Sequence, residues 1–140
     1  MGRILAIDYG TKRVGLAVSD PLQIIANGLD TVATADLFDF LKKYIATETV
    51  ETLVVGMPMH LDGNPAQIAD KVEGFIKAFK KLFPDIMVET QDERFTSEDA
   101  KKIILKSGAK KKKRRDKSLV DKVAAILILQ DYMESKRSFY

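Results

Sequence analysis

Two short apolar runs stand close together near the N-terminus, at residues 4–7 and 14–18, and a polar link that contains Gly10 separates them. Runs of this length around a glycine-containing link are typical of the two strands of a β-hairpin. Asp8 follows the first run directly. A carboxylate at a strand end costs stability unless donors or a cation satisfy it, although Asp also serves in turns by bonding its own backbone. The pattern alone leaves both roles of Asp8 open.

The rest of the chain alternates between strand-like runs and helical periodicity. Strand-like runs occupy residues 24–31, 52–55 and 86–90. Gly28 weakens the first of these runs, and Gly56 is expected to end the second. Apolar residues at helical spacing predict helices from Asp36, from Pro65 to about residue 83, from Thr96 to Gly108, and from residue 119 to about residue 134.

Capping residues and apolar stripes indicate where two of these helices begin and which faces they bury. Asn64 is a good N-cap for the second helix, which has Pro65 at its first position. Ser118 with Asp121 resembles a capping box at the start of the last helix, which is apolar nearly all round and therefore buried. The stripe of the second helix that should face the core consists of Ile68, Val72, Phe75, Ile76, Phe79 and Leu82.

This order of elements indicates an α/β fold. Strands that alternate with helices after an initial hairpin predict a mixed, mostly parallel, five-stranded sheet with helices on both faces. In such sheets ligands bind at the carboxyl ends of the strands. With 140 residues the chain is expected to form a single domain over residues 1–140.

Composition excludes several classes of site. The chain has no cysteine, so neither a disulfide nor a thiolate zinc site can form. The first apolar run has only four residues, too few for a signal peptide or a membrane span. We therefore expect a soluble, cytoplasmic protein without membrane contact.

The positive charge is concentrated in one segment. The chain has a net charge of +3, but residues 110–117 hold seven of its 23 Lys and Arg and one of its 20 acids. The remainder has 16 basic and 19 acidic residues and a net charge of −3. A basic segment on a mildly acidic body is typical of a local surface for a polyanion.

Three carboxylates are candidates for a metal site. Asp8 and Glu93 each follow a predicted strand, and Asp121 is predicted to lie in the first turn of the last helix, so all three can meet at one edge of the sheet. Carboxylates without a cationic partner favour hard cations such as Mg²⁺. Two such ions about 4 Å apart activate a water and stabilise the leaving oxygen of a phosphodiester. Alternatively, Glu93 pairs with a neighbour such as Arg94, and Asp121 only caps its helix.

The basic residues nearby are candidates for phosphate contacts. Lys12 and Arg13 lie just beyond Asp8, within reach of the same edge, although they could also form a solvated hairpin tip. Six consecutive cations repel one another, and phosphates relieve that cost, but the same run could be a solvated loop. We expect the nucleic-acid backbone to contact Lys12, Arg13, Arg94, Lys110, Lys111, Lys112, Lys113, Arg114 and Arg115.

Four blocks along the chain resemble the signatures of the YqgF family of Holliday-junction-resolvase-like proteins. They are DYGTKRVGLAVSD, VVGMP followed by DGN, DERFTS, and VDKVAAILIL. The resemblance implies a ribonuclease H-like fold and a nuclease that matures the 5′ end of the 16S ribosomal RNA precursor; an older suggestion for the family is junction resolution. It also matches Asp8, Glu93 and Asp121 to the acidic positions of the family. Many members of the wider superfamily carry a further acid at the end of the fourth strand, where this chain has Gly56.

Three hypotheses follow. The first is an endonuclease with Mg²⁺ or Mn²⁺ as cofactor, in which Asp8 bridges two ions, Glu93 and Asp121 complete their ligands, and water is the nucleophile. Its partners would be structured RNA such as pre-rRNA, or branched DNA, together with ribosomal particles, and it would be a monomer or a weak homodimer. The second is a nucleic-acid-binding module without turnover, which Gly56 favours. The third is a nucleotide-binding fragment, because DYGT before a strand also resembles the phosphate loop of actin-like ATPases and sugar kinases.

Overall fold

The computed structural model describes residues 2–57, 65–92 and 117–137. In these ranges the chain forms one five-stranded sheet in the order β3-β2-β1-β4-β5. The strands are β1 (Arg3–Tyr9), β2 (Arg13–Ser19), β3 (Ala26–Ala33), β4 (Val50–Met57) and β5 (Met87–Asp92). The helices are a 3₁₀ turn η1 (Thr34–Asp36), α1 (Leu37–Thr47), α2 (Pro65–Leu82) and α5 (Lys117–Arg137).

The sheet is mixed, as the sequence predicts. β1 pairs antiparallel with β2, and β2 antiparallel with β3. β1 also pairs parallel with β4, and β4 parallel with β5. The expectation of a mostly parallel sheet is wrong, because half of these pairings are antiparallel. β1 is the central strand, and its carboxyl end lies at the same edge as those of β4 and β5.

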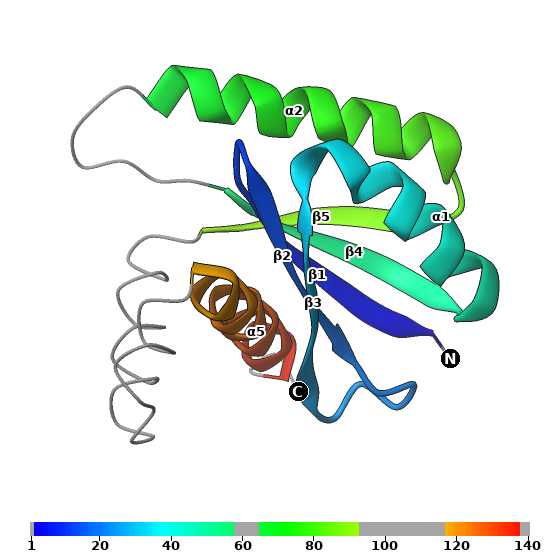
Figure 1. Cartoon of the computed structure of the whole chain (residues 1–140). Helices are drawn as coiled ribbons and strands as arrows, with labels where there is room; N and C mark the ends of the chain where they lie inside the picture. The colour runs from blue at the N-terminus through cyan, green and yellow to red at the C-terminus, as the bar shows by residue number, and fades with distance from the viewer. Residues whose placement is uncertain (1, 58–64, 93–116, 138–140) are drawn as a thin grey trace.

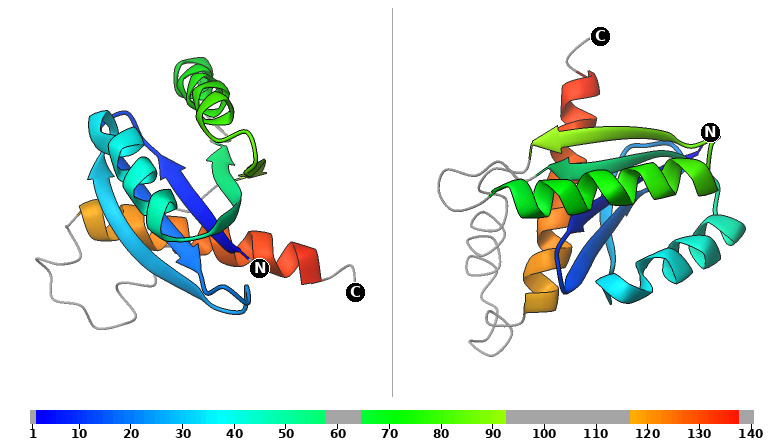
Figure 2. Two further views of the ribbon diagram at one scale, coloured as in Figure 1. Left: turned by 90° about the vertical axis from the view of Figure 1, so that its right-hand side faces the viewer. Right: turned by 90° about the horizontal axis from the view of Figure 1, so that it is seen from above.

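Helices cover both faces of the sheet. Helices α1 and α2 lie on one face and α5 crosses the other, as Figures 1 and 2 show. Successive side chains of β1 point to opposite faces of the sheet and are buried on both. Leu5 and Ile7 belong to the core under α1 and α2, whereas Ile4 and Ala6 pack with α5. We call these sides the α1/α2 face and the α5 face. None of the described helices is long and apolar enough to cross a membrane.

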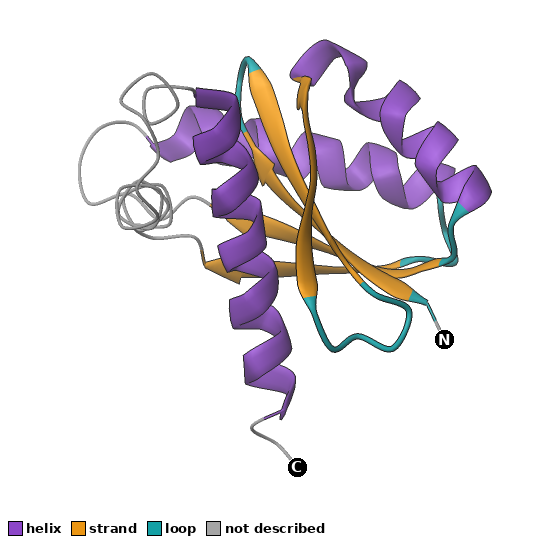
Figure 3. Ribbon diagram, turned by 60° about the horizontal axis from the view of Figure 1, so that its bottom comes forward, coloured by secondary structure: helices purple, strands orange, loops and turns teal. Residues whose placement is uncertain are grey.

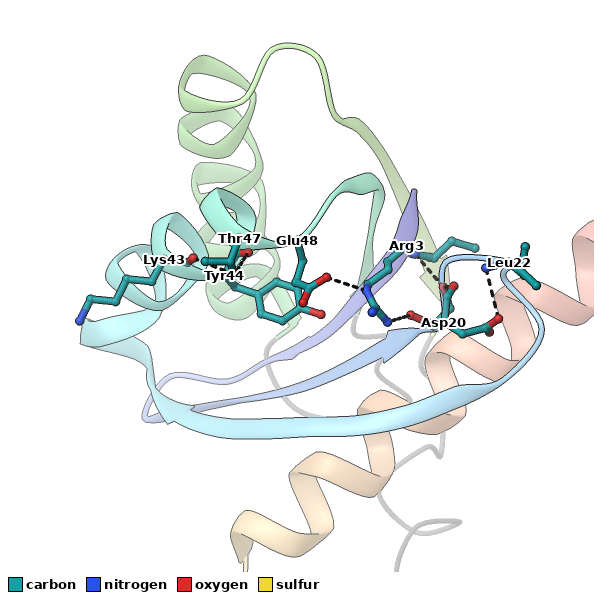
Figure 4. A network of polar contacts seen from close by, with 9 residues as sticks. Arg3, Asp20, Leu22, Lys43, Tyr44, Thr47 and Glu48 are labelled. Atoms are coloured by element: carbon teal, nitrogen blue, oxygen red, sulfur yellow. Dashed lines mark hydrogen bonds and ion pairs between the residues drawn. The ribbon is translucent and has the colours of Figure 1, made fainter. Parts of the chain in front are cut away.

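The amino-terminal end of β1 is held by one arginine. Arg3 pairs with Glu48, with Nε 3.3 Å from Oε2, and its Nη1 donates to the carbonyl oxygen of Ser19 at 3.1 Å. The buried hydroxyl of Ser19 accepts the N–H of Ile4 at 2.8 Å. These contacts join β1, the end of β2 and the α1–β4 connection, as Figure 4 shows in part.

The start of β3 differs from the prediction. Ile24 and Ile25 are exposed and precede the strand, which begins at Ala26. The carboxylate of Asp20 accepts the N–H groups of both, each at 2.7 Å, and that of Leu22 at 3.2 Å. These hydrogen bonds lower the pKa of Asp20, and the bond from Ile25 contributes most. The backbone N–H groups of residues 24 and 25 therefore donate to Asp20 instead of to a neighbouring strand.

Two further boundaries and one expected burial need correction. Gly56 lies inside β4, which continues to Met57, so it does not end the strand. Leu82 closes α2 but is 47% exposed, although Val72, Phe75 and Phe79 of the same stripe are buried as predicted. Helix α5 begins at Lys117, so Ser118 lies within the helix and cannot be its N-cap. The predicted helix from Thr96 to Gly108 and the cap at Asn64 lie outside the described residues.

Candidate active site

Asp8 lies near the carboxyl end of the central strand, on the α5 face. It is two residues beyond Ala6, which packs with α5, and side chains two apart in a strand share a face. Its cross-strand partner on β2 is Gly15. On its other side Ile7 pairs with Val55, so the next residues along, Asp8 and Gly56, are neighbours. The half-buried carboxylate therefore stands between two positions that carry no side chain.

Helix α5 rests directly on β2 at Gly15. A Cβ atom built on Gly15 would lie 2.0 Å from the carbonyl oxygen of Asp121 and 2.4 Å from its carbonyl carbon. Only glycine permits this approach of the helix backbone. Figure 3 shows α5 crossing the sheet on this side. Cross-strand neighbours place their Cβ atoms about 5 Å apart, so Asp8 and the Asp121 backbone share one corner of the fold, which we call the carboxylate corner.

Asp121 forms an ion pair that the sequence did not predict. Its Oδ2 accepts a hydrogen bond from Arg13 Nε at 2.9 Å, and the two side chains are 23% and 37% exposed. Asp121 is the fifth residue of α5, so it lies beyond the first turn and its interpretation as a capping residue is wrong. Arg13 begins β2 on the same face as Gly15. The two residues are 108 positions apart in sequence, and no local sequence pattern predicts a contact over such a separation.

The link between β1 and β2 is fixed from the start of η1. The hydroxyl of Thr34 donates to the carbonyl oxygen of Gly10 at 2.7 Å. The N–H of Thr34 donates to the carbonyl oxygen of Lys12 at 3.0 Å. Lys12 itself is exposed at this turn. Contacts with Thr34 thus fix the backbone of the turn between β1 and β2, from which Lys12 is exposed.

Several predicted site residues lie outside the described residues. These are Glu93, Arg94, Lys110, Lys111, Lys112, Lys113, Arg114 and Arg115. Gly56 pairs with Gln91, two residues before Glu93, so β5 leads toward the same edge. Within the described ranges no group of three or more His, Cys, Asp or Glu residues could hold a metal ion.

The donor set of the carboxylate corner nevertheless fits magnesium. Asp8 and Asp121 both offer carboxylate oxygens. Mg²⁺ typically uses one or two protein carboxylates, together with waters and the phosphates of its substrate. The chemistry of these two residues therefore suits an ion that arrives with, or is completed by, a phosphate.

Two surface depressions of the described structure lie away from the carboxylate corner. One of about 400 Å³ is formed by the α1–β4 and α2–β5 connections, at the opposite end of the sheet. Another of about 340 Å³ lies between Ile24, Ile25 and the second half of α5. Neither is lined by Asp8 or Asp121.

Comparison with known proteins shows what the chain resembles. A family model described as RuvX, Holliday junction resolvase, matches residues 2–135. A Flavobacterium johnsoniae protein named "Putative pre-16S rRNA nuclease" is 50% identical over 137 residues, covering 98% of this chain and 99% of the relative. A Bacteroides thetaiotaomicron protein of the same name has the same identity and coverage.

The solved structures bear on the fold. The structure described as T. thermophilus RuvC in complex with Holliday junction substrate is similar with a TM-score of 0.59 and 16% sequence identity, over 98% of this chain and 96% of that one. At this identity the likeness concerns the fold, and it confirms the predicted ribonuclease H-like architecture with a mixed five-stranded sheet.

Proposed function

Because the chain belongs to the RuvX, or YqgF-like, family of Holliday junction resolvases, we propose that it is an endonuclease that hydrolyses phosphodiester bonds in structured nucleic acid. The substrate that we propose is the precursor of 16S ribosomal RNA, cleaved at its 5′ end. Relatives at 50% identity over nearly their whole length carry the name "Putative pre-16S rRNA nuclease". Junction resolution is the alternative, but the one solved junction complex named above is only 16% identical and speaks for the fold alone.

The observation that carries this proposal is the carboxylate corner. Asp8 pairs with Gly15, and Gly15 contacts the backbone of Asp121, so two acids from opposite ends of the chain converge. Together with Glu93, they would hold Mg²⁺ or Mn²⁺. Such an ion supplies activation of a water and neutralisation of the charge on the leaving oxygen.

The basic residues would position the substrate. Lys12 is exposed at the turn between β1 and β2 that Thr34 fixes. Arg13 presents a guanidinium that matches the geometry of a phosphate. Arg94 and the basic run, residues 110–115, would add contacts that set affinity without reading sequence. These cations would thus orient one phosphodiester over the three acids that would hold the ion.

A non-catalytic binding module is the second candidate. Gly56 stands beside Asp8 where many members of the superfamily carry another acid. If Glu93 does not compensate, the ligands would be too few for turnover. In that case the protein would bind the same nucleic acids and release them intact.

The test compares cleavage of labelled pre-16S rRNA and of a four-way DNA junction, with Mg²⁺, with Mn²⁺ and with EDTA. We expect metal-dependent cleavage of the RNA at its 5′ end. Asp8→Asn should abolish cleavage and leave binding intact or tighter, because it removes one ligand charge and one repulsive charge. Asp30→Asn is the matched control, since Asp30 is an exposed acid that pairs with Leu16, a residue of the α1/α2 face.

The outcomes separate the candidates. Binding without cleavage of either substrate would support the non-catalytic module. Cleavage of the junction alone would support resolution. If Asp8→Asn cleaves at the wild-type rate, the metal site is wrong or the activity belongs to a contaminant.

A further inference from the structure

The Arg13–Asp121 ion pair occupies a proposed metal ligand. Two side-chain ion pairs lie within the described residues at opposite ends of the sheet, Arg3–Glu48 and Arg13–Asp121. The first joins elements at the amino-terminal end of β1, far from the chemistry. The second places a guanidinium directly on the carboxylate that Mg²⁺ would need. This contact raises the question of what Arg13 does when the ion binds.

A divalent cation and the guanidinium compete for the same carboxylate. A cation between Asp8 and Asp121 would bring two like charges together if Arg13 stayed at 2.9 Å from Oδ2. Arg13 begins its strand next to the exposed turn at Lys12, and its side chain is 37% exposed, so it can turn outward. A phosphate is its natural alternative partner, because arginine binds phosphates through two parallel hydrogen bonds.

We propose that Arg13 is a positioning residue that exchanges partners. Without substrate it neutralises Asp121, and with substrate it binds a backbone phosphate and leaves Asp121 to the metal ion. Metal and nucleic acid therefore bind with positive coupling, and each strengthens the other by the same factor. This inference rests on the proposed function, since it assigns a role toward the same site.

The ion pair has a further consequence for the free protein. Two carboxylates at one corner repel each other, and the guanidinium offsets that repulsion in the absence of metal. The contact also ties the second turn of α5 to the start of β2, beside the close contact at Gly15. The corner is thus held in place for its ligands before they arrive.

The test measures Mn²⁺ affinity of the intact protein by the paramagnetic resonance signal of free Mn²⁺, so it needs no turnover. Arg13→Gln should bind Mn²⁺ about threefold to fivefold more tightly than wild type, the effect expected from losing a partly exposed ion pair. Arg13→Lys, which can still pair with Asp121, should stay near wild type. In an Asp121→Asn background the Arg13→Gln change should have no effect. Circular dichroism confirms that each variant is folded.

Charge alone is tested by Lys12→Gln, which removes the same charge one residue away without breaking an ion pair. The inference predicts a smaller change than for Arg13→Gln. It is overturned if the two variants behave alike, or if the Arg13→Gln effect persists in the Asp121→Asn background.

Asp8→Asn distinguishes failure of the inference from failure of the proposed site. Mn²⁺ binding that Asp8→Asn weakens but Arg13→Gln leaves unchanged overturns the role of Arg13 and keeps the metal site. Mn²⁺ binding that is absent, or indifferent to Asp8→Asn, overturns the metal site and with it the inference.

Discussion

The contact between Gly15 and α5 gives the sharpest prediction for stability. Gly15→Ala would place a Cβ atom 2.0 Å from the carbonyl oxygen of Asp121, and the atom in the way belongs to the backbone of a long helix. No side-chain rotation can relieve that clash, so α5 must move away from β2. Overpacking of a core costs about 1–3 kcal/mol and occasionally more, and a shift of a whole helix belongs at the upper end. We expect a loss of about 3 kcal/mol in the free energy of unfolding.

Two other glycines supply the controls. Gly74 is exposed in the middle of α2, and a Cβ there would meet no atom within 4 Å. Gly74→Ala should stabilise the protein by about 0.5–1 kcal/mol, because glycine is a poor helix residue. A Cβ on Gly28 would meet the side chain of Lys122 at 2.8 Å, which can yield. Gly28→Ala should therefore cost less than about 1 kcal/mol.

The assay is chemical denaturation of wild type and the three alanine variants, followed by circular dichroism. The expected order of stability is Gly74→Ala, wild type, Gly28→Ala, Gly15→Ala. In thermal melts, the Gly15→Ala loss corresponds to a midpoint about 10 °C lower for a chain of this size. Stability of Gly15→Ala within about 0.5 kcal/mol of wild type would refute the argument, because α5 could then not lie on β2 as described.

Two further perturbations test the charges. Replacing the six residues of the basic run with serine should weaken binding to a duplex, a junction and a single strand alike. On duplex, the slope of log K against log salt should become shallower by about 3–4 units. An unchanged slope would assign binding to Lys12 and Arg13. Asp20→Asn should destabilise the protein at neutral pH, because the N–H donors of the turn lower the pKa of Asp20. That contribution is present above the unfolded-state pKa of about 3.9 and is lost as pH falls through the lower folded-state pKa, so wild type and variant should converge in acid denaturation, and a pH-independent difference would count against this role.

Local patterns predicted most of the architecture. The two apolar runs of the hairpin and the helical stripes of α1 and α2 depend on near neighbours in sequence, and the hairpin and both helices appear where expected. The exceptions have physical causes. Asp20 accepts hydrogen bonds from the backbone N–H groups of Ile24 and Ile25, so β3 begins only after these residues. Leu82 continues the stripe of α2 but is half exposed at the end of the helix.

The candidate site was predictable only in part. Asp8 follows a strand at a carboxyl edge, and that position can be recognised from sequence. The ion pair between Arg13 and Asp121 cannot, because it depends on how α5 crosses the sheet. Gly15 interrupts an apolar run, and sequence alone offers no reason for it. The structure supplies one, since the helix backbone occupies the place of a side chain.

The placement of α5 has a consequence for the order of synthesis. The α5 face carries Ile4, Ala6, Ala17 and Val54, all of which are translated before the helix that buries them. A nascent chain that ends before Lys117 therefore exposes an apolar sheet face and lacks Asp121. Helix α5 supplies both the hydrophobic cover of this face and the second acid of the proposed metal site. An unfinished chain is therefore prone to aggregation and lacks a complete site. A chain truncated after residue 116 should bind a hydrophobic dye strongly and bind no Mn²⁺ at this corner.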